Sequence, residues 1–132
     1  MTKERAYELA KQASYNSDYK QALGAVAIYC GKLLALGWNS HKTHPGQARY
    51  NSLERGFDGY SFQSTIHAEM MVINKIKYLD INFNKVKLFV WRGKDHPRLS
   101  KPCAACERAL RDLGIRHVYY TGNNSYIEET YI

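Results

Sequence analysis

The chain has 132 residues, of which 45% are hydrophobic and 23% are charged, and its formal net charge is +7. This length and composition predict one globular domain over residues 1–132, and no segment reaches the ~20 apolar residues of a membrane span. The charged N-terminus lacks the apolar stretch of a secretory signal, so we expect a soluble cytoplasmic protein with no membrane partner.

The excess of positive charge is compatible with two kinds of anionic partner, a nucleotide phosphate or a nucleic acid backbone. A basic surface that only keeps the protein in solution explains the charge equally well. Charge alone therefore leaves the partner open.

The first predicted element is a helix that Thr2 caps and that runs to about Tyr15. Its apolar residues follow the spacing of one buried helical face: Ala6, Leu9, Ala10 and Ala13. Two short apolar runs come next, at 23–30 and 33–36, and the residues Gly31 and Lys32 between them predict a β-hairpin in a sheet covered on both faces. Cys30 is expected to be a small buried core residue.

The stretch between Asn39 and Thr65 is polar and contains Pro45 and several glycines, which predicts a long functional or mobile loop. Its basic side chains could bind a phosphate or a second metal, although solvated surface groups would look the same. These side chains are His41, Lys42, His44, Arg49 and Arg55.

The second half of the chain alternates between helical and extended patterns. We predict a buried helix over 67–79, a strand over 86–91, a helix over 103–113 that ends at Gly114, and a strand over 117–120. The segment 122–132 either adds an edge strand or stays loose. The order of elements predicts an α/β sandwich whose last two predicted strands are parallel, because a helix connects them.

Two short motifs carry the chemistry, and each is predicted to open a helix. The first is His67-Ala68-Glu69, and the second is Pro102-Cys103-Ala104-Ala105-Cys106. Cysteines three residues apart lie on one helical face, and a helix N-terminus favours their thiolate forms. Three nitrogen and sulfur ligands with an open fourth position are typical of catalytic zinc. We therefore predict a Zn²⁺ site made by His67, Cys103 and Cys106.

Glu69 lies two residues beyond the predicted histidine ligand, in the first turn of its helix. Zinc lowers the pKa of a bound water towards ~7, and a nearby carboxylate can take a proton from that water and deliver it to a substrate. Glu69 is therefore the predicted catalytic acid and base. The pair of motifs is itself a known signature of zinc deaminases.

The chain resembles the cytidine and deoxycytidylate deaminase superfamily, and its deoxycytidylate (CMP/dCMP) type in particular, over nearly its whole length. The resemblance rests on both motifs and on three further segments in the same order: Gly24-Ala25-Val26, Gly37-Trp38-Asn39 and Gly114 to Tyr120. It implies a three-layer α/β/α sandwich with about five strands, hydrolytic deamination, and assembly into dimers or hexamers.

The resemblance also implies substrate-binding roles for individual residues. Asn39 is similar to the asparagine that hydrogen-bonds the sugar, and Ala68 to the residue whose backbone reads the pyrimidine. Ser100 and Lys101, which precede the cysteine motif, are further candidates. Trp91 and Arg92, which end the predicted strand before the cysteine helix, either line the base pocket or are a core residue and a surface residue, respectively.

The leading hypothesis is removal of the 4-amino group from a free cytosine nucleotide, converting dCMP to dUMP and ammonia. A deaminase acting on a base in RNA or single-stranded DNA is the second hypothesis, which the basic charge favours and the short predicted C-terminal segment disfavours. The third is a zinc-stabilised nucleotide or nucleic acid binding module without catalysis.

Overall fold

The computed structural model describes residues 1–42, 44–55, 65–93 and 97–131. The first half contains α1 (Lys3–Ser14), β1 (Leu23–Tyr29), β2 (Lys32–Trp38) and α2 (Pro45–Arg55). The second half contains α3 (Ala68–Ile76), a 3-10 turn η2 (Phe83–Lys85), β3 (Lys87–Arg92), α4 (Ala104–Leu113), β4 (His117–Gly122) and β5 (Ser125–Thr130). Among the described residues, no helix combines the length and the apolar character that crossing a membrane would need.

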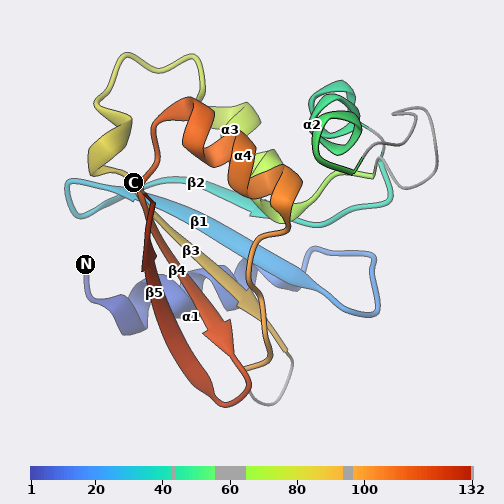
Figure 1. Cartoon of the computed structure of the whole chain (residues 1–132). Coiled ribbons are helices and arrows are strands. Elements are labelled where there is room, and N and C mark those ends of the chain that lie inside the picture. The colour runs from blue at the N-terminus through green and yellow to red at the C-terminus, as the bar shows by residue number, and fades with distance from the viewer. Residues whose placement is uncertain (43, 56–64, 94–96, 132) are drawn as a thin grey trace.

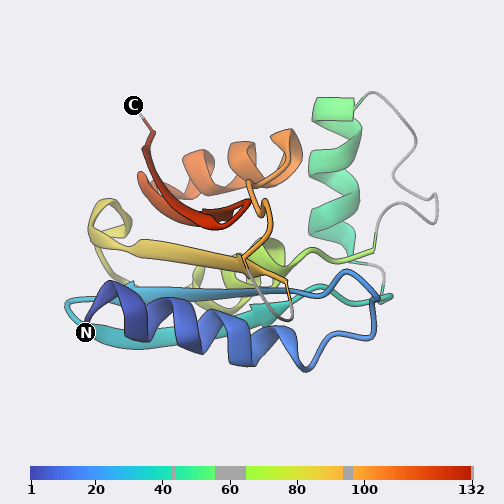
Figure 2. The ribbon, with the colours of Figure 1, turned by 90° about the horizontal axis from the view of Figure 1, so that it is seen from below.

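The five strands form one mixed sheet in the order β2-β1-β3-β4-β5. Helix α1 covers one face, while α3 and α4 cover the other and α2 packs beside α4 (Figure 1; Figure 2). Strands β3 and β4, which α4 connects, are parallel, and every other pairing is antiparallel. The predicted three-layer α/β/α sandwich with a parallel crossover pair is confirmed, and the C-terminal segment adds an antiparallel edge strand.

The turn between β1 and β2 corrects the prediction for Cys30. This residue is exposed and has a φ of 51°, and the following Gly31 has a φ of 77°. Two successive positive φ values are typical of the tight turns that connect hairpin strands. Cys30 therefore belongs to the turn and not to the buried part of the strand.

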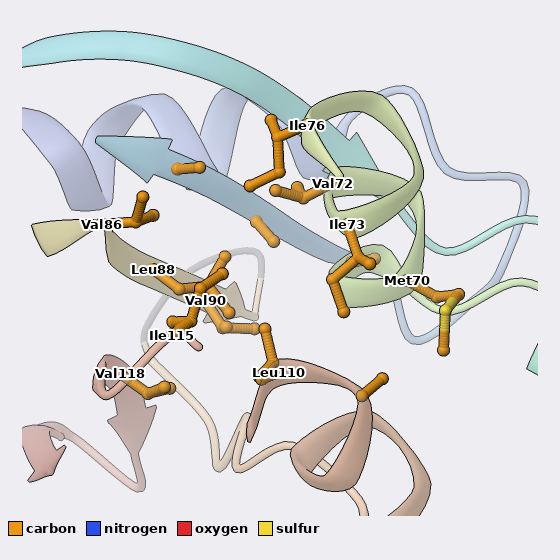
Figure 3. Close-up of a cluster of buried hydrophobic side chains, with 14 of the residues drawn as sticks. Met70, Val72, Ile73, Ile76, Val86, Leu88, Val90, Leu110, Ile115 and Val118 are labelled. Carbon is orange, nitrogen blue, oxygen red and sulfur yellow. The ribbon is translucent and has the colours of Figure 1, made fainter. Parts of the chain in front are cut away.

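Two apolar clusters hold the layers together. The larger cluster fills the space between the sheet and helices α3 and α4 (Figure 3). The smaller one joins α1 to the opposite sheet face through Val26, Ile28, Phe89 and Trp91. Alternate residues of β3 thus enter different clusters, as the alternation of side chains along a strand requires.

Helix α3 ends at Ile76, three residues before the predicted end, and Leu79 is exposed.

Helix α2 corrects the prediction of a loop over 39–65. It begins at Pro45, a residue whose fixed φ suits the first turn of a helix. The side that faces the protein contains Gln47 and Asn51, both fully buried and joined by a 2.9 Å hydrogen bond. Because polar residues form this buried side, the hydrophobic periodicity that predicts helices was missing.

Gly37 allows β2 to lie directly against the first turn of α3. A Cβ atom at this position would lie 2.5 Å from the backbone oxygen of Ala68 and 2.8 Å from a methyl group of Val72. We expect Gly37→Ala to lower the free energy of unfolding by about 1–3 kcal/mol, because one backbone must move away from the other. Urea denaturation measures this loss, and a change below about 0.5 kcal/mol would show that the contact is not as close as described.

Candidate metal centre and active site

The N-terminal ends of α3 and α4 meet on the same side of the sheet. His67 is the N-cap residue of α3, and Cys103 is the N-cap residue of α4, both with extended backbones. Cys106 lies one turn further into α4 and is fully buried. The two motifs, separated by more than thirty positions in the chain, are thereby brought into one place, as the sequence predicted.

The potential ligand atoms of His67, Cys103 and Cys106 all lie within 4.8 Å of one another. The Nδ1 atom of His67 is 3.5 Å from Sγ of Cys103 and 3.3 Å from Sγ of Cys106. Tetrahedral zinc with Zn–S near 2.3 Å and Zn–N near 2.0–2.1 Å would separate a sulfur and a nitrogen by about 3.6 Å. Both the donor types and their spacing therefore fit a single Zn²⁺ ion.

The pKa values of the two thiols are shifted in opposite directions. A hydrogen bond from the Cys106 thiol holds the pKa of Cys103 down at about 3, against the opposing effect of burial. The same hydrogen bond, together with burial, raises the pKa of Cys106 well above its usual range. One sulfur is thus a ready thiolate, and the second would lose its proton when a metal binds, because metal ligation requires the thiolate.

Glu69 lies beside this cluster in the first turn of α3 and has only 4% of its surface exposed. Burial is the main reason why its pKa is raised, while the adjacent His67 acts in the opposite direction. The carboxyl group borders a cavity of about 270 Å³ that His67, Ala68 and Cys103 also line. A carboxyl group in this position can hold a proton or release it to a molecule in the cavity.

The raised pKa of Glu69 predicts how the metal-free protein responds to pH. The folded state binds this proton more tightly than the unfolded chain does, so stability falls as pH rises above about 4, the ordinary carboxyl range. Glu69→Gln removes that ionisation. We therefore expect the Tm of the metal-free variant to exceed that of the parent by an amount that grows from acidic to neutral pH.

Thermal melts of the chelated proteins across this range measure the difference. The control is Glu107→Gln, which changes a half-buried carboxyl group on α4 that lies 3.9 Å from Arg111. A difference between parent and Glu69→Gln that stays constant with pH would show that ionisation of Glu69 does not affect stability.

Helix α2 holds the histidine in place through a residue that the sequence analysis missed. The backbone N–H of His67 donates a 3.1 Å hydrogen bond to Oε1 of Gln47. Gln47 in turn donates to Asn51 one helical turn later. The i, i+4 spacing of two amide side chains after Pro45 was the available signal, but their polarity was interpreted as that of a loop.

Asn39 and Ala68 both line the cavity, where the sequence analysis expected them. The amide of Asn39 anchors the loop that precedes β1. Its Oδ1 accepts hydrogen bonds from the backbone of Leu23 at 2.8 Å and from Ser17 at 2.6 Å, and its Nδ2 donates to the Gln21 carbonyl at 3.1 Å. These bonds fill both acceptor sites of Oδ1 and use one of the two N–H groups, and the other has no hydrogen-bond partner among the residues that the structure describes.

Ser100 and Lys101 also line the cavity, but their polar groups have partners in the protein. The buried hydroxyl of Ser100 donates to the Val90 carbonyl at 3.0 Å and lies 2.8 Å from Oγ1 of Thr121. Lys101 is exposed and lies 3.9 Å from Glu129. Ser100 thus fixes the loop before the cysteine motif to β3 and β4.

The position of Trp91 corrects its predicted role. Its ring lies in the apolar cluster under α1, on the opposite face of the sheet from the zinc ligands, and its Nε1 donates to the Gly93 carbonyl at 2.7 Å. It is not among the lining residues described for the cavity. The neighbouring Arg92 does line the cavity, because successive side chains of a strand point to opposite faces.

Tyr19 is a further lining residue that the sequence analysis did not identify. Its hydroxyl lies 2.7 Å from Oγ1 of Thr65, and its ring stacks on His41 with centroids 3.9 Å apart. The His41 ring is in turn 2.9 Å from Asp18. His41 therefore supports one wall of the cavity from behind.

Three other basic residues of the 40–65 segment, Lys42, His44 and Arg49, are not among the residues that line the cavity. His44 accepts a hydrogen bond from the Gly46 backbone at 3.0 Å, and it lines a separate hollow with Arg49 between α2, α3 and α4. Lys42 is exposed. Arg55 ends α2, and its side chain lies outside the described part of the structure.

Several solved structures resemble this fold. The cytidine deaminase of Burkholderia pseudomallei has a TM-score of 0.70 at 18% identity, covering 98% of this chain and 93% of its own. The apo dCMP deaminase of the cyanophage S-TIM5 has a TM-score of 0.53 at 26% identity, covering 91% of this chain and 84% of its own. The same phage enzyme in complex with dCMP and dUMP has a TM-score of 0.55 at 23% identity, covering 91% of this chain and 82% of its own.

A search of curated protein sequences gives no significant match. The family described as the cytidine and deoxycytidylate deaminase zinc-binding region, in contrast, matches residues 1–122 of the chain. This match includes both motifs and every residue of the cluster. The chain therefore belongs to the cytidine and deoxycytidylate deaminase family.

Proposed function

We propose that the protein is a zinc-dependent hydrolase that removes the 4-amino group of a cytosine nucleotide, with dCMP converted to dUMP and ammonia. The observation that carries the proposal is the buried Glu69 beside the cluster of His67, Cys103 and Cys106, at the wall of one cavity. A structural zinc site has no need for a buried carboxyl group with a raised pKa at an open cavity.

Zinc held by His67, Cys103 and Cys106 would supply Lewis acidity that makes water a stronger acid. Glu69 accepts a proton from the attacking water through its carboxylate and delivers it to N3 of the cytosine ring. It then carries a second proton to the 4-amino nitrogen, so that ammonia leaves as C4 becomes a carbonyl. Water supplies both the new oxygen and the two transferred protons, and the atoms balance.

Other residues of the cavity would position the substrate. Ala68 would offer its backbone to the pyrimidine edge, and Asn39, which lines the same cavity, would donate its second amide N–H to the sugar. Ser100 holds the loop that carries Lys101 and Cys103. Binding and orientation of this kind supply a large part of an enzymatic rate enhancement.

The choice of dCMP follows from the resemblance to the deoxycytidylate type and from the phage dCMP deaminase at 26% identity. Cytidine is the second candidate, because the cytidine deaminase of Burkholderia pseudomallei has the same fold over 98% of this chain. A cytoplasmic location and assembly into dimers or hexamers stay predictions, which fractionation and native mass measurement would test.

Ammonia release from the zinc-loaded protein tests the proposal. The substrates are dCMP, CMP, deoxycytidine, cytidine, dCTP, and short RNA and DNA strands that contain cytosine. We expect dCMP to have the highest kcat/KM. Turnover of nucleosides alone would replace dCMP with cytidine or deoxycytidine, and no turnover of any substrate would exclude the enzyme and favour a binding module.

A further inference from the structure

Helix α2 carries none of the three predicted metal ligands, but it contacts both helices that do. Towards α4, the hydroxyl of Tyr50 donates a 2.8 Å hydrogen bond to Oδ2 of Asp112. Towards α3, Oε1 of Gln47 accepts the 3.1 Å hydrogen bond from the backbone N–H of His67. One helix thus connects the histidine ligand to the helix that carries both cysteine ligands.

The first turn of α2 is fixed by His44, the residue before Pro45. Its Nδ1 accepts a 3.0 Å hydrogen bond from the backbone N–H of Gly46, and its carbonyl accepts one from Ala48 at 3.0 Å. Bonds of this kind satisfy N–H groups that have no partner inside the helix. Gln47 lies between the two donors, so its side chain reaches the start of α3 from a fixed backbone.

The orientation of the Gln47 amide is set by the backbone of His67. A backbone N–H can only donate, so the atom of Gln47 that faces it must be the amide oxygen. The amide nitrogen then faces Asn51 and donates to its Oδ1 at 2.9 Å. Turning the amide over would place N–H groups opposite the His67 N–H and an oxygen opposite Oδ1, and both bonds would be lost. The network therefore holds in one direction only.

Stability alone does not explain why two amide side chains occupy this place. Gln47 and Asn51 are both fully buried. A buried hydrogen bond adds little net stability, and an apolar pair of the same shape can be equally stable. An apolar pair would, however, remove the acceptor that the N–H of His67 uses. The polar pair thus serves the residue that it holds.

We propose that Gln47 is a positioning residue for the metal centre, which holds the backbone of His67 so that the imidazole stays in place. Nδ1 of His67 lies 3.5 Å and 3.3 Å from the two cysteine sulfurs, and a turn of the backbone at this N-cap position would carry the ring away from them. The inference deepens the proposed function and rests on it for its catalytic consequence. Partners that orient metal ligands typically contribute about 10- to 100-fold to metal affinity.

Zinc affinity, measured by competition with a chromogenic chelator, tests the proposal. Gln47→Met keeps a side chain of similar length but removes the acceptor, and it should weaken zinc binding by about tenfold or more. Gln47→Glu keeps an oxygen facing the N–H of His67 and should recover most of the parental affinity. Gln12→Met is the matched control, because it makes the same change at an exposed position of α1, on the opposite face of the sheet.

Two further measurements separate positioning from a general loss of stability. The absorption spectrum of Co²⁺ bound in place of zinc reports the geometry of the ligands, and it should change in Gln47→Met. Val118→Ala opens a hole in the core at a fully buried residue that does not line the cavity. It should lower the Tm but keep the zinc affinity and the Co²⁺ spectrum of the parent.

A second variant keeps the test decisive if Gln47→Met does not fold. Asn51→Leu removes the acceptor that fixes the Gln47 amide, and it should change zinc affinity and the Co²⁺ spectrum in the same direction. Parental affinity and a parental spectrum in whichever of the two variants folds would overturn the proposal.

These measurements need no turnover, so failure of the positioning role and failure of the proposed function are distinguishable. If the parent deaminates nothing but Gln47→Met binds zinc more weakly with an altered Co²⁺ spectrum, the positioning role stands and the function fails. If the parent deaminates dCMP and Gln47→Met matches it in zinc affinity, spectrum and kcat, the function stands and the positioning role is excluded.

Discussion

Glu69→Gln should reduce kcat by about 10²- to 10⁴-fold while the protein keeps its zinc. The amide has nearly the same shape as the carboxyl group and fits the same buried position, but it cannot accept and release a proton. Because the ligands His67, Cys103 and Cys106 are unchanged, metal binding should survive. Ammonia release and zinc content, measured on the same preparation, check both halves of this expectation.

The control for this variant is again Glu107→Gln, a carboxyl group on α4 that is absent from the cavity lining. It should stay within about twofold of the parent in kcat. If Glu69→Gln retained more than a tenth of the parental kcat, Glu69 would not be the proton carrier. If it lost zinc as well as activity, its role would be to support the metal site.

Cys106→Ser should remove zinc binding and, with it, activity. The sulfur of Cys106 is one of three ligand atoms and is fully buried, so no other group in the cluster can replace it. Loss of a residue that only hydrogen-bonds a metal ligand typically lowers metal affinity by about 10- to 100-fold. Loss of the ligand itself should therefore lower the zinc affinity by more than about 100-fold. Competition with a chromogenic chelator measures the affinity, and ammonia release measures the activity.

Cys30→Ser is the matched control, because Cys30 is an exposed thiol in the β1–β2 turn. It should bind zinc as the parent does. Circular dichroism establishes whether Cys106→Ser folds, and Cys103→Ser, at a half-buried position, repeats the test with less disturbance of the core. Stoichiometric zinc in both Cys103→Ser and Cys106→Ser would contradict the assignment of the ligands.

The cluster could be predicted from sequence because its geometry is mostly local. Cys103 and Cys106 are three residues apart at the start of one helix, and His67 and Glu69 share the first turn of another. The long-range step, the meeting of two helix N-termini, rested on the pattern of zinc ligands and on the resemblance to the deaminase superfamily. The β3–β4 pairing is parallel because α4 connects these strands across the sheet.

The error for Cys30 came from the local geometry of the β1–β2 turn. Other errors concern residues whose roles are set by distant partners. Trp91 was placed by chain proximity to the motif, yet the alternation of side chains along β3 turns it towards α1. The α2 helix was missed because its buried side uses Gln47 and Asn51, whose partners are each other and the His67 backbone. Tyr19 gained its position at the cavity only through the packing of its loop, whereas Arg92, which was a candidate for the pocket, does line it.

X-ray absorption at the zinc edge of the purified, untreated protein tests the central claim most directly. It reports the amount of zinc and the atoms bound to it in a single sample. We predict one zinc per chain with two sulfur neighbours near 2.3 Å and two lighter neighbours near 2.0–2.1 Å, one of them from an imidazole. A protein without stoichiometric zinc, or a zinc shell with other than two sulfurs, would contradict a metal centre built from His67, Cys103 and Cys106.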